Sequence, residues 1–181
     1  MTTIKDALTG ILGNVTDDEP KSPMHIGEVM NLWLYHGTLT EANRYVEIAL
    51  NTTTDDELIV ALKHSFEDCS KQVAKIEDLF KKEGISLPPT PTPKPRSNPD
   101  DVPSGVKLTD DEIANGLSLK VVSAITLCAS GISQAIRSDI GTMWLNFLLA
   151  RVKFGAMLNS LMRKRGWIKV PPYYYSSKRS E

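Results

Sequence analysis

Histidine and cysteine are scarce in this chain, and their scarcity limits the chemistry it can support. Among 181 residues there are three histidines and two cysteines. Cys69 and Cys128 both fall within helical patterns, so we expect them to be free, buried thiols rather than parts of a disulfide framework. No histidine belongs to a Glu-x-x-His motif, which excludes the ligand set of a carboxylate di-iron centre. We therefore expect no cofactor.

The chain also lacks an excess of charge, a long apolar run and a catalytic motif. Its 21 basic and 22 acidic residues argue against a nucleic-acid partner. No apolar run reaches the roughly 20 residues of a membrane span, and the first six residues do not resemble a secretory signal. Neither a Gly-x-Ser-x-Gly motif nor a phosphate-binding glycine loop occurs. These absences predict a cytoplasmic protein that is not an enzyme and binds neither nucleic acid nor membrane.

A proline-rich segment lies between two pairs of helical patterns. Its prolines are Pro88, Pro89, Pro91, Pro93, Pro95, Pro99 and Pro103. Because proline removes a backbone donor and restricts the residue before it, this segment cannot be helical. We predict a stiff, extended connection over residues 84–108.

On either side of that connection, apolar residues recur every three to four positions. The predicted helices cover about 23–50, 55–83, 109–136 and 139–165. A narrow period near 3.5 residues is typical of a left-handed bundle. Residues 22–166 are therefore expected to form one all-α four-helix bundle, preceded by an arm over 1–21 and followed by a tail over 167–181.

Cap residues and core stripes refine these helices. The predicted starts use Ser22 with Pro23, Thr54 with Glu57, Thr109 with Glu112, and Ser138. The stripe of the third helix consists of small residues around Gly131, so this helix should approach its neighbours closely. The predicted stripe of the fourth helix is Ile140, Met143, Phe147, Ala150, Phe154, Met157 and Leu161.

The length of the connection favours one topology. Each helix of about 28 residues is about 42 Å long, whereas 25 residues of extended, proline-rich chain reach up to roughly 75 Å. A hairpin turn would need only two to eight residues. We therefore predict a ferritin-like bundle with one long crossover between parallel second and third helices. An up-down-up-down bundle with a loose loop is the alternative.

The crossover topology would gather six polar residues at one end of the bundle. They are His25, Glu28, Glu77, Gln134, Arg137 and Asp139. One interpretation is a capping network in which Arg137 pairs with a carboxylate, because buried charges are normally paired. The other is a small-ligand or metal site in which His25, Glu28 and Asp139 would suit Zn²⁺ or Fe²⁺.

Both ends of the chain offer candidate contact segments. The tail carries Trp167 and the three tyrosines Tyr173, Tyr174 and Tyr175, which are too apolar for an idle terminus. They are expected either to fold back on the bundle or to contact a partner. The arm has apolar residues at helical spacing. This pattern indicates either a short amphipathic arm or disordered leader, or a partner-binding helix.

Several short stretches together resemble a known family. They are Pro23-Met24-His25-Ile26-Gly27-Glu28-Val29, Gly84-Ile85-Ser86-Leu87-Pro88-Pro89, Ile136-Arg137-Ser138-Asp139-Ile140, and Lys164-Arg165-Gly166-Trp167 with Pro171-Pro172. Over roughly residues 20–173 the chain resembles a ferritin-like family of spore-forming bacteria related to spore coat protein F. The resemblance implies a ferritin-like bundle with a coat or coat-associated role, and it supplies no catalytic residue.

Two functional hypotheses follow. The first is a spore-coat-like structural or interaction protein, whose partners would be coat proteins or further copies of this chain. The second is a ferritin-like protein that binds a metal or small ligand at the end cluster.

Overall fold

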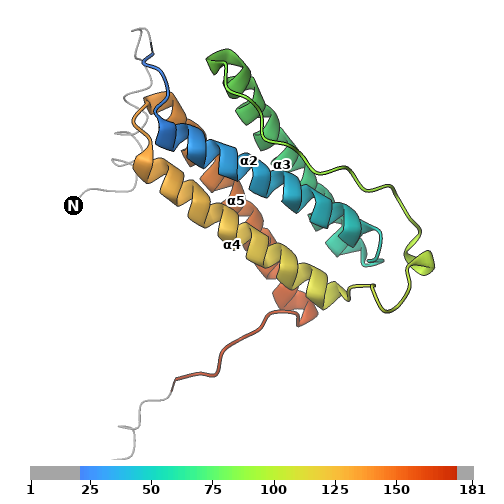
Figure 1. Cartoon of the computed structure of the whole chain (residues 1–181). Helices are drawn as coiled ribbons and strands as arrows, with labels where there is room; N and C mark the ends of the chain where they lie inside the picture. Colours follow the sequence, from blue (N-terminus) through green and yellow to red (C-terminus); the bar gives the residue numbers. More distant parts are fainter. Residues whose placement is uncertain (1–20, 175–181) are drawn as a thin grey trace, which may run out of the picture.

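The computed structural model describes residues 21–174, and these residues form four long α-helices without a strand (Figure 1). The elements are α2 (Ile26–Leu50), α3 (Asp56–Glu83), the short 3-10 helix η2 (Pro99–Asp101), α4 (Asp110–Gln134) and α5 (Ser138–Arg165). The predicted all-α four-helix bundle is confirmed. Most of the predicted arm, residues 1–20, lies outside the described residues, as do residues 175–181.

The first two helices begin at caps other than those predicted. His25, rather than Ser22, caps α2, and its Nδ1 accepts the N–H of Gly27 at 3.0 Å. Asp55, rather than Thr54, caps α3 by accepting the N–H of Leu58 at 2.9 Å. The second error arises because the adjacent Thr54 and Asp55 can both cap. Histidine is not among the preferred N-cap residues, so no rule of capping pointed to His25.

Of the other two predicted caps, one is right and one is wrong. Thr109 caps α4 and forms a capping box with Glu112. Hydrogen bonds from Thr109 hold the pKa of Glu112 below its usual value. Ser138 lies inside α5, whose N-cap is Arg137 without a side-chain capping bond. The guanidinium of Arg137 is committed to neighbouring carboxylates instead.

The proline-rich connection, which we call the strap (residues 84–108), runs the length of the bundle (Figure 1). It leaves α3 at Gly84, a C-cap in the left-handed region. It then delivers the chain to the start of α4, where the hydroxyl of Thr53 donates to Asp110 Oδ1 at 2.6 Å. Thr53 lies just before the start of α3, so α3 and α4 run parallel. The predicted crossover is confirmed.

Specific hydrogen bonds fasten the strap to the end of α2. The Asn51 side-chain amide donates to the carbonyl of Pro95 at 2.9 Å and accepts the N–H of Ser97 at 3.1 Å. Glu47 accepts the N–H of Lys94 at 2.7 Å. Further back, Thr90, Pro91 and Pro93 line a groove between α2 and α3. The strap therefore covers the outer side of the α2/α3 hairpin.

Two buried clusters fill the interior, one in each half of the bundle. The half near the start of α2 is aromatic: Tyr35 stacks on Phe147 and meets Trp144 edge to face, at centroid distances of 5.7 and 5.0 Å. The other half is mainly aliphatic and includes Val46, Leu62, Leu117 and Leu158. Aliphatic and aromatic burial of this kind is the main source of stability in a helical bundle.

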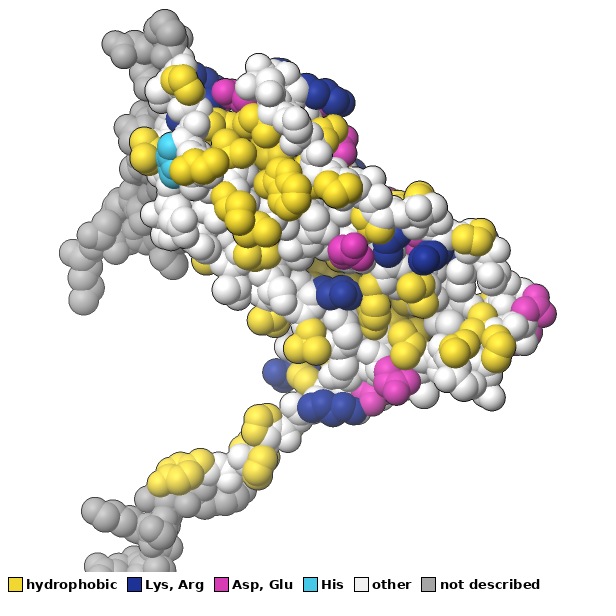
Figure 2. Space-filling view, viewed as in Figure 1, with side chains coloured by type: hydrophobic (Ala, Val, Ile, Leu, Met, Phe, Trp, Pro, Cys, Tyr) yellow, Lys and Arg dark blue, Asp and Glu magenta, His cyan; other side chains and the backbone are white. Residues whose placement is uncertain are grey.

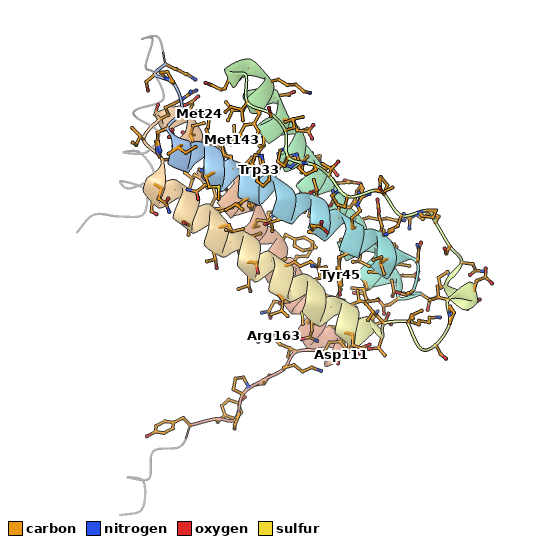
Figure 3. All side chains as sticks on the ribbon, in the orientation of Figure 1. Met24, Trp33, Tyr45, Asp111, Met143 and Arg163 are labelled. Atoms are coloured by element: carbon orange, nitrogen blue, oxygen red, sulfur yellow. The ribbon has the colours of Figure 1, made fainter. Side chains whose placement is uncertain are left out.

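Small residues on α4 let large side chains approach, as predicted. A Cβ on Gly131 would overlap the indole of Trp144, and one on Gly116 would overlap the hydroxyl of Tyr45. Tyr45 reaches from α2 to the carbonyl of Ile113 on α4, at 3.0 Å (Figure 3). Glycine is therefore required at both positions for packing, not for a turn.

The buried stripe of α5 differs from the predicted one. Trp144, Arg151 and Leu158 face the core, whereas Met157 is exposed. The residues predicted at the corresponding depths were Met143, Ala150 and Met157. Both sets follow the three-and-four spacing of a bundle helix, and the arginine made the correct register look polar.

Candidate functional site

Glu28 is the centre of the polar cluster at the end of the bundle. Its side chain is 2% exposed. Its carboxylate accepts the backbone N–H groups of Ile136 and Arg137, at 2.8 and 2.9 Å, and that of His25 at 3.2 Å. These are charge-assisted bonds to N–H groups that would otherwise lack a partner. Glu28 therefore joins the start of α2 to the turn between α4 and α5.

Arg137 connects this turn to α3. Its guanidinium donates to Asp139 through Nε and Nη2, at 3.1 and 2.9 Å, and to Glu83 through Nη1 at 2.7 Å. The hydrogen bonds to Asp139, and secondarily to Glu83, raise the pKa of Arg137. Lys21 completes the group with an ion pair to Asp139 at 2.8 Å.

The pKa of Asp139 reflects these partners. Burial raises the pKa of this carboxyl, but hydrogen bonds from Arg137 and Lys21 outweigh burial and lower it to about 2. The carboxylate is therefore ionised throughout the physiological range and neutralised by two cations. A group in this state has no proton to exchange near neutral pH.

Two of the six predicted residues take other parts. Glu77 does not reach the cluster, because α3 continues to Glu83 and that residue meets Arg137 instead. Glu77 pairs with the fully buried His36, at 3.1 Å. Gln134 is at the cluster, but its side chain bonds Asn31, and it is the Gln134 carbonyl that His25 Nε2 approaches, at 3.3 Å.

The proposed metal ligands do not form a metal site. Glu28 is engaged by backbone N–H groups, and Asp139 by Arg137 and Lys21. Within residues 21–174 no group of three or more His, Cys, Asp or Glu side chains could hold a metal ion. The contacts of His25, Glu28 and Asp139 fit the capping interpretation, and the hypothesis of a site for Zn²⁺ or Fe²⁺ has no support in this geometry.

A second polar group, which sequence reasoning missed, lies in the middle of the bundle. Arg151 is 2% exposed. Its Nη1 donates to Cys69 Sγ at 3.3 Å, and its Nη2 lies 3.4 Å from Asp68 Oδ2. With the Gln72 amide turned to satisfy both neighbours, its oxygen accepts from Arg151 at 3.3 Å and its nitrogen donates to the Tyr35 hydroxyl at 2.8 Å.

This central group does not suit nucleophilic chemistry. Burial raises the pKa of Cys69, and it raises that of Cys128 to about 11. Burial, together with Cys128, also raises the pKa of Tyr35. Both thiols are free and buried, as predicted. They remain protonated at neutral pH, and a protonated thiol is a poor nucleophile.

Ferritin-like proteins use the middle of the bundle for dinuclear metal sites built from carboxylates and histidines. Here that level carries the guanidinium of Arg151, two thiols and an amide, with Asp68 as the adjoining carboxylate. A fixed cation stands among these side chains, so the residues do not fit a dinuclear metal centre. The acidic layer is replaced by a hydrogen-bonded layer centred on arginine.

The tail divides into a docked part and an exposed part. Trp167 and Ile168 pack against the aliphatic half of the core. Asn115 donates to the carbonyl of Trp167 at 3.0 Å, and Lys169 pairs with Asp111, which is labelled in Figure 3. Tyr173 and Tyr174 are exposed, and Tyr175 lies outside the described residues. Trp167 therefore folds back on the bundle, whereas contact of the tyrosines with a partner stays a prediction.

Four helices with one long crossover and an arginine-centred interior define a ferritin-like bundle without the usual carboxylate and histidine ligands. The fold is shared with a two-domain protein of Anabaena variabilis that contains DJ-1/ThiJ/PfpI-like and ferritin-like domains. The TM-score is 0.63 at 14% identity, and the match covers 96% of this chain and 52% of that one.

The chain belongs to the protein family of unknown function DUF3231, whose model matches residues 14–179. It is 30% identical to the uncharacterized protein YvdQ of Bacillus subtilis over 168 residues, which is 91% of this chain and 95% of YvdQ. It is also similar to the crystal structure of the "putative spore coat protein" BH2358 of Bacillus halodurans. That match has a TM-score of 0.81 at 29% identity and covers 86% of this chain and 98% of BH2358. The family resemblance inferred from the sequence is confirmed.

Proposed function

We propose that this protein is a non-catalytic, spore-coat-like component that acts by contacting other proteins. The observation that carries the proposal is its likeness to BH2358 over nearly the whole of that chain. The interior supports the same reading, because the two polar groups around Arg137 and around Arg151 are occupied by internal partners. Arg137 and Glu28 hold helix ends together, and Arg151 fills the level at which ferritin-like enzymes bind metal.

The exposed tail is a second element of the proposal. Tyr173 and Tyr174 are exposed beyond the docked Trp167. Tyrosine combines a large apolar surface with a hydroxyl group, and it is enriched at protein interfaces. Together with Tyr175, these side chains would provide an aromatic contact for a coat protein.

Localisation in a sporulating Bacillus tests the proposed function. A fluorescent fusion to the N-terminus is expected to surround the developing spore and to remain with the coat fraction after spores are purified. Fluorescence that stays uniform in the mother-cell cytoplasm, with no protein in the coat fraction, would overturn the proposal.

Two truncations separate the tail contact from folding. A chain ending at Val170 keeps Trp167 and the Lys169–Asp111 pair but lacks the tyrosines. We expect it to melt like the full chain and to lose most of its coat localisation. A chain ending at Gly166 also loses the docked residues and should melt at a lower temperature. Full localisation of the chain ending at Val170 would show that the tyrosines are not needed for the contact with the coat.

A further inference from the structure

The outer sides of α4 and α5 each carry an apolar stripe that the bundle does not bury. On α4 the outward stripe is Leu119, Val122, Thr126, Ala129 and Ser133, and on α5 it includes Leu149, Val152 and Ala156. Leu119, Val122, Leu149 and Val152 are 69%, 57%, 54% and 48% exposed. The spacing alternates between three and four residues, which is the pattern by which one helix packs on another. We call this surface the α4/α5 face.

A groove of about 620 Å³ occupies the half of this face nearest the start of α4. Its lining includes Val121, Val122, Ile125 and Val152, together with the small residues Gly155 and Ala156. The corresponding groove on the α2/α3 hairpin lies beneath the strap. No described segment covers the α4/α5 groove. Figure 2 shows that further hydrophobic side chains are exposed on the adjoining side, which α2 and α4 form.

Charge is sparse on the α4/α5 face. Between Lys120 and the end of α4 at Gln134 there is no charged residue. Arg163 is the one charged residue that lines the groove, and Lys153, four residues after Leu149, is exposed on the outer side of α5. By length and composition, α4 is the one described helix that could cross a membrane, a test that core helices of soluble proteins also pass. A face of this composition is typical of protein interface cores, from which charged residues are depleted.

We propose that the α4/α5 face is the contact surface for a second copy of this chain, packed about a two-fold axis with the two α4 helices antiparallel. The face is about 37 Å long and about 20 Å wide, so it could bury about 700 Å² on each copy, near the roughly 800 Å² of a standard interface. A single extended segment such as the strap would cover only one groove of it.

Side-chain size also favours a second copy. The larger residues, Leu119 and Val122, lie in the first half of the stripe, and the smaller ones, Ala129 and Ser133, lie in the second half. An antiparallel pairing centred on Thr126 sets Leu119 opposite Ser133, and Val122 opposite Ser130 and the adjacent Ala129, of the other copy. Large side chains then meet small ones along the contact, which lets the two surfaces interdigitate.

The same two-fold axis places the charge of Arg163 near an oppositely charged helix end of the other copy. Arg163 lies at the end of the groove near the start of α4. The two-fold rotation carries it toward the C-terminal end of the other copy's α4, where unpaired carbonyl groups give the helix its negative pole. The two Arg163 guanidinium groups are thereby separated, and each copy completes the groove of the other.

This inference rests on the proposed function only in that the protein acts through contacts, and purified protein tests it. The solution mass of the full chain is measured by sedimentation equilibrium for the wild type, Val122→Glu and the matched control Val60→Glu. Val60 is exposed on α3, outside the face. We expect a wild-type dimer, an increase of about 100-fold or more in the dissociation constant for Val122→Glu, because two carboxylates would be buried without partners, and no change for Val60→Glu.

A cross-link provides a test that does not depend on the tolerance of Val122→Glu. Thr126→Cys lies near the axis and should form an interchain disulfide with oxidised glutathione, whereas Lys63→Cys on α3 should not. A wild-type monomer at micromolar concentration, equal weakening by Val122→Glu and Val60→Glu, or no preference for the Thr126→Cys cross-link would each overturn the proposal. These results are separable from coat localisation, which can succeed or fail with either oligomeric state.

Discussion

The two hairpins of the bundle differ in what covers their outer grooves. The groove of α2 and α3 is lined by polar residues such as Asn43, Ser70 and Glu77 together with Phe66, Val73 and Ala74, and the strap lies over it. The groove of α4 and α5 is lined mostly by valine, isoleucine and small residues, and no described segment lies over it. A chain that covers one groove itself and leaves the other open has a surface suited to another molecule.

The two hairpins share the buried polar group around Arg151. Removing Arg151 is therefore expected to cause the largest loss of stability. Arg151→Ala removes the cation that joins α5 to Cys69, Asp68 and Gln72 on α3. Loss of one partner of a buried ion pair typically costs about 3–5 kcal/mol, and urea unfolding should show a loss of this size. Lys153→Ala, an exposed neighbour on α5, should change stability by less than about 0.5 kcal/mol. Equal effects of the two substitutions would contradict the structural role of Arg151.

The close approach within the α4/α5 hairpin gives the next effect. Gly131→Ala places a methyl group within the indole of Trp144 and should destabilise the bundle by about 1–3 kcal/mol, the usual cost of overpacking. Gly37→Ala in α2 is the matched control, because a Cβ there meets no atom within 4 Å. It should stabilise the protein by up to about 1 kcal/mol through helix propensity. Thermal melts of the two variants should therefore shift in opposite directions.

Removing the hydrogen bonds that attach the strap tests whether Asn51 holds the strap over the α2/α3 groove. Asn51→Ala deletes two hydrogen bonds, to Pro95 and Ser97, and should cost about 1–2 kcal/mol. Limited proteolysis should then cut the strap faster while α4 and α5 stay protected. Asn159→Ala, on the open side, bonds only Arg163 and should leave the strap resistant. A strap equally resistant in both variants would show that Asn51 does not hold it.

Acid should weaken the end where the hairpins meet, by an amount similar to the loss of the Asn51 hydrogen bonds. Because the folded pKa of Asp139, about 2, lies below its ordinary value of 3.8, the carboxylate stabilises the fold fully above pH 4. This contribution, about 1–2 kcal/mol with allowance for partial exposure, is lost as pH falls from about 4 to about 2. Asp139→Asn should be less stable at neutral pH by this amount and should lose less stability across that range. Parallel pH profiles for the two proteins would contradict the assignment.

The course of the chain could be predicted because it depends on strong local signals. Proline excludes helix from the strap, and the strap is too long for a hairpin turn, so the crossover follows. The three-and-four spacing gave the helices, but in α5 it fits both the stripe through Ala150 and the stripe through Arg151. Choosing between them requires knowing that Asp68 and Gln72 on another helix would accept the guanidinium.

The position of the end cluster was predicted correctly, but not all of its residues were. Glu28, Arg137 and Asp139 do meet there, because helix order and length decide which ends are adjacent. Glu83 replaces Glu77 because it lies in the last turn of α3, six residues closer to the end that meets Arg137. The end of α3 was predicted correctly, but the wrong carboxylate of that helix was assigned to the cluster. The partners of Glu28 are backbone N–H groups. Because every residue except proline has one, the sequence cannot indicate which of them Glu28 binds.

Hydrogen exchange, measured at protein concentrations below and above the dimer dissociation constant, shows whether the α4/α5 face is the contact surface. Amides in residues 118–130 and 145–158 should become more protected as protein concentration rises, while those in α3 and the strap should not change. Protection that is independent of concentration throughout the chain, or that rises on the strap side instead, would show that the α4/α5 face is not the contact surface.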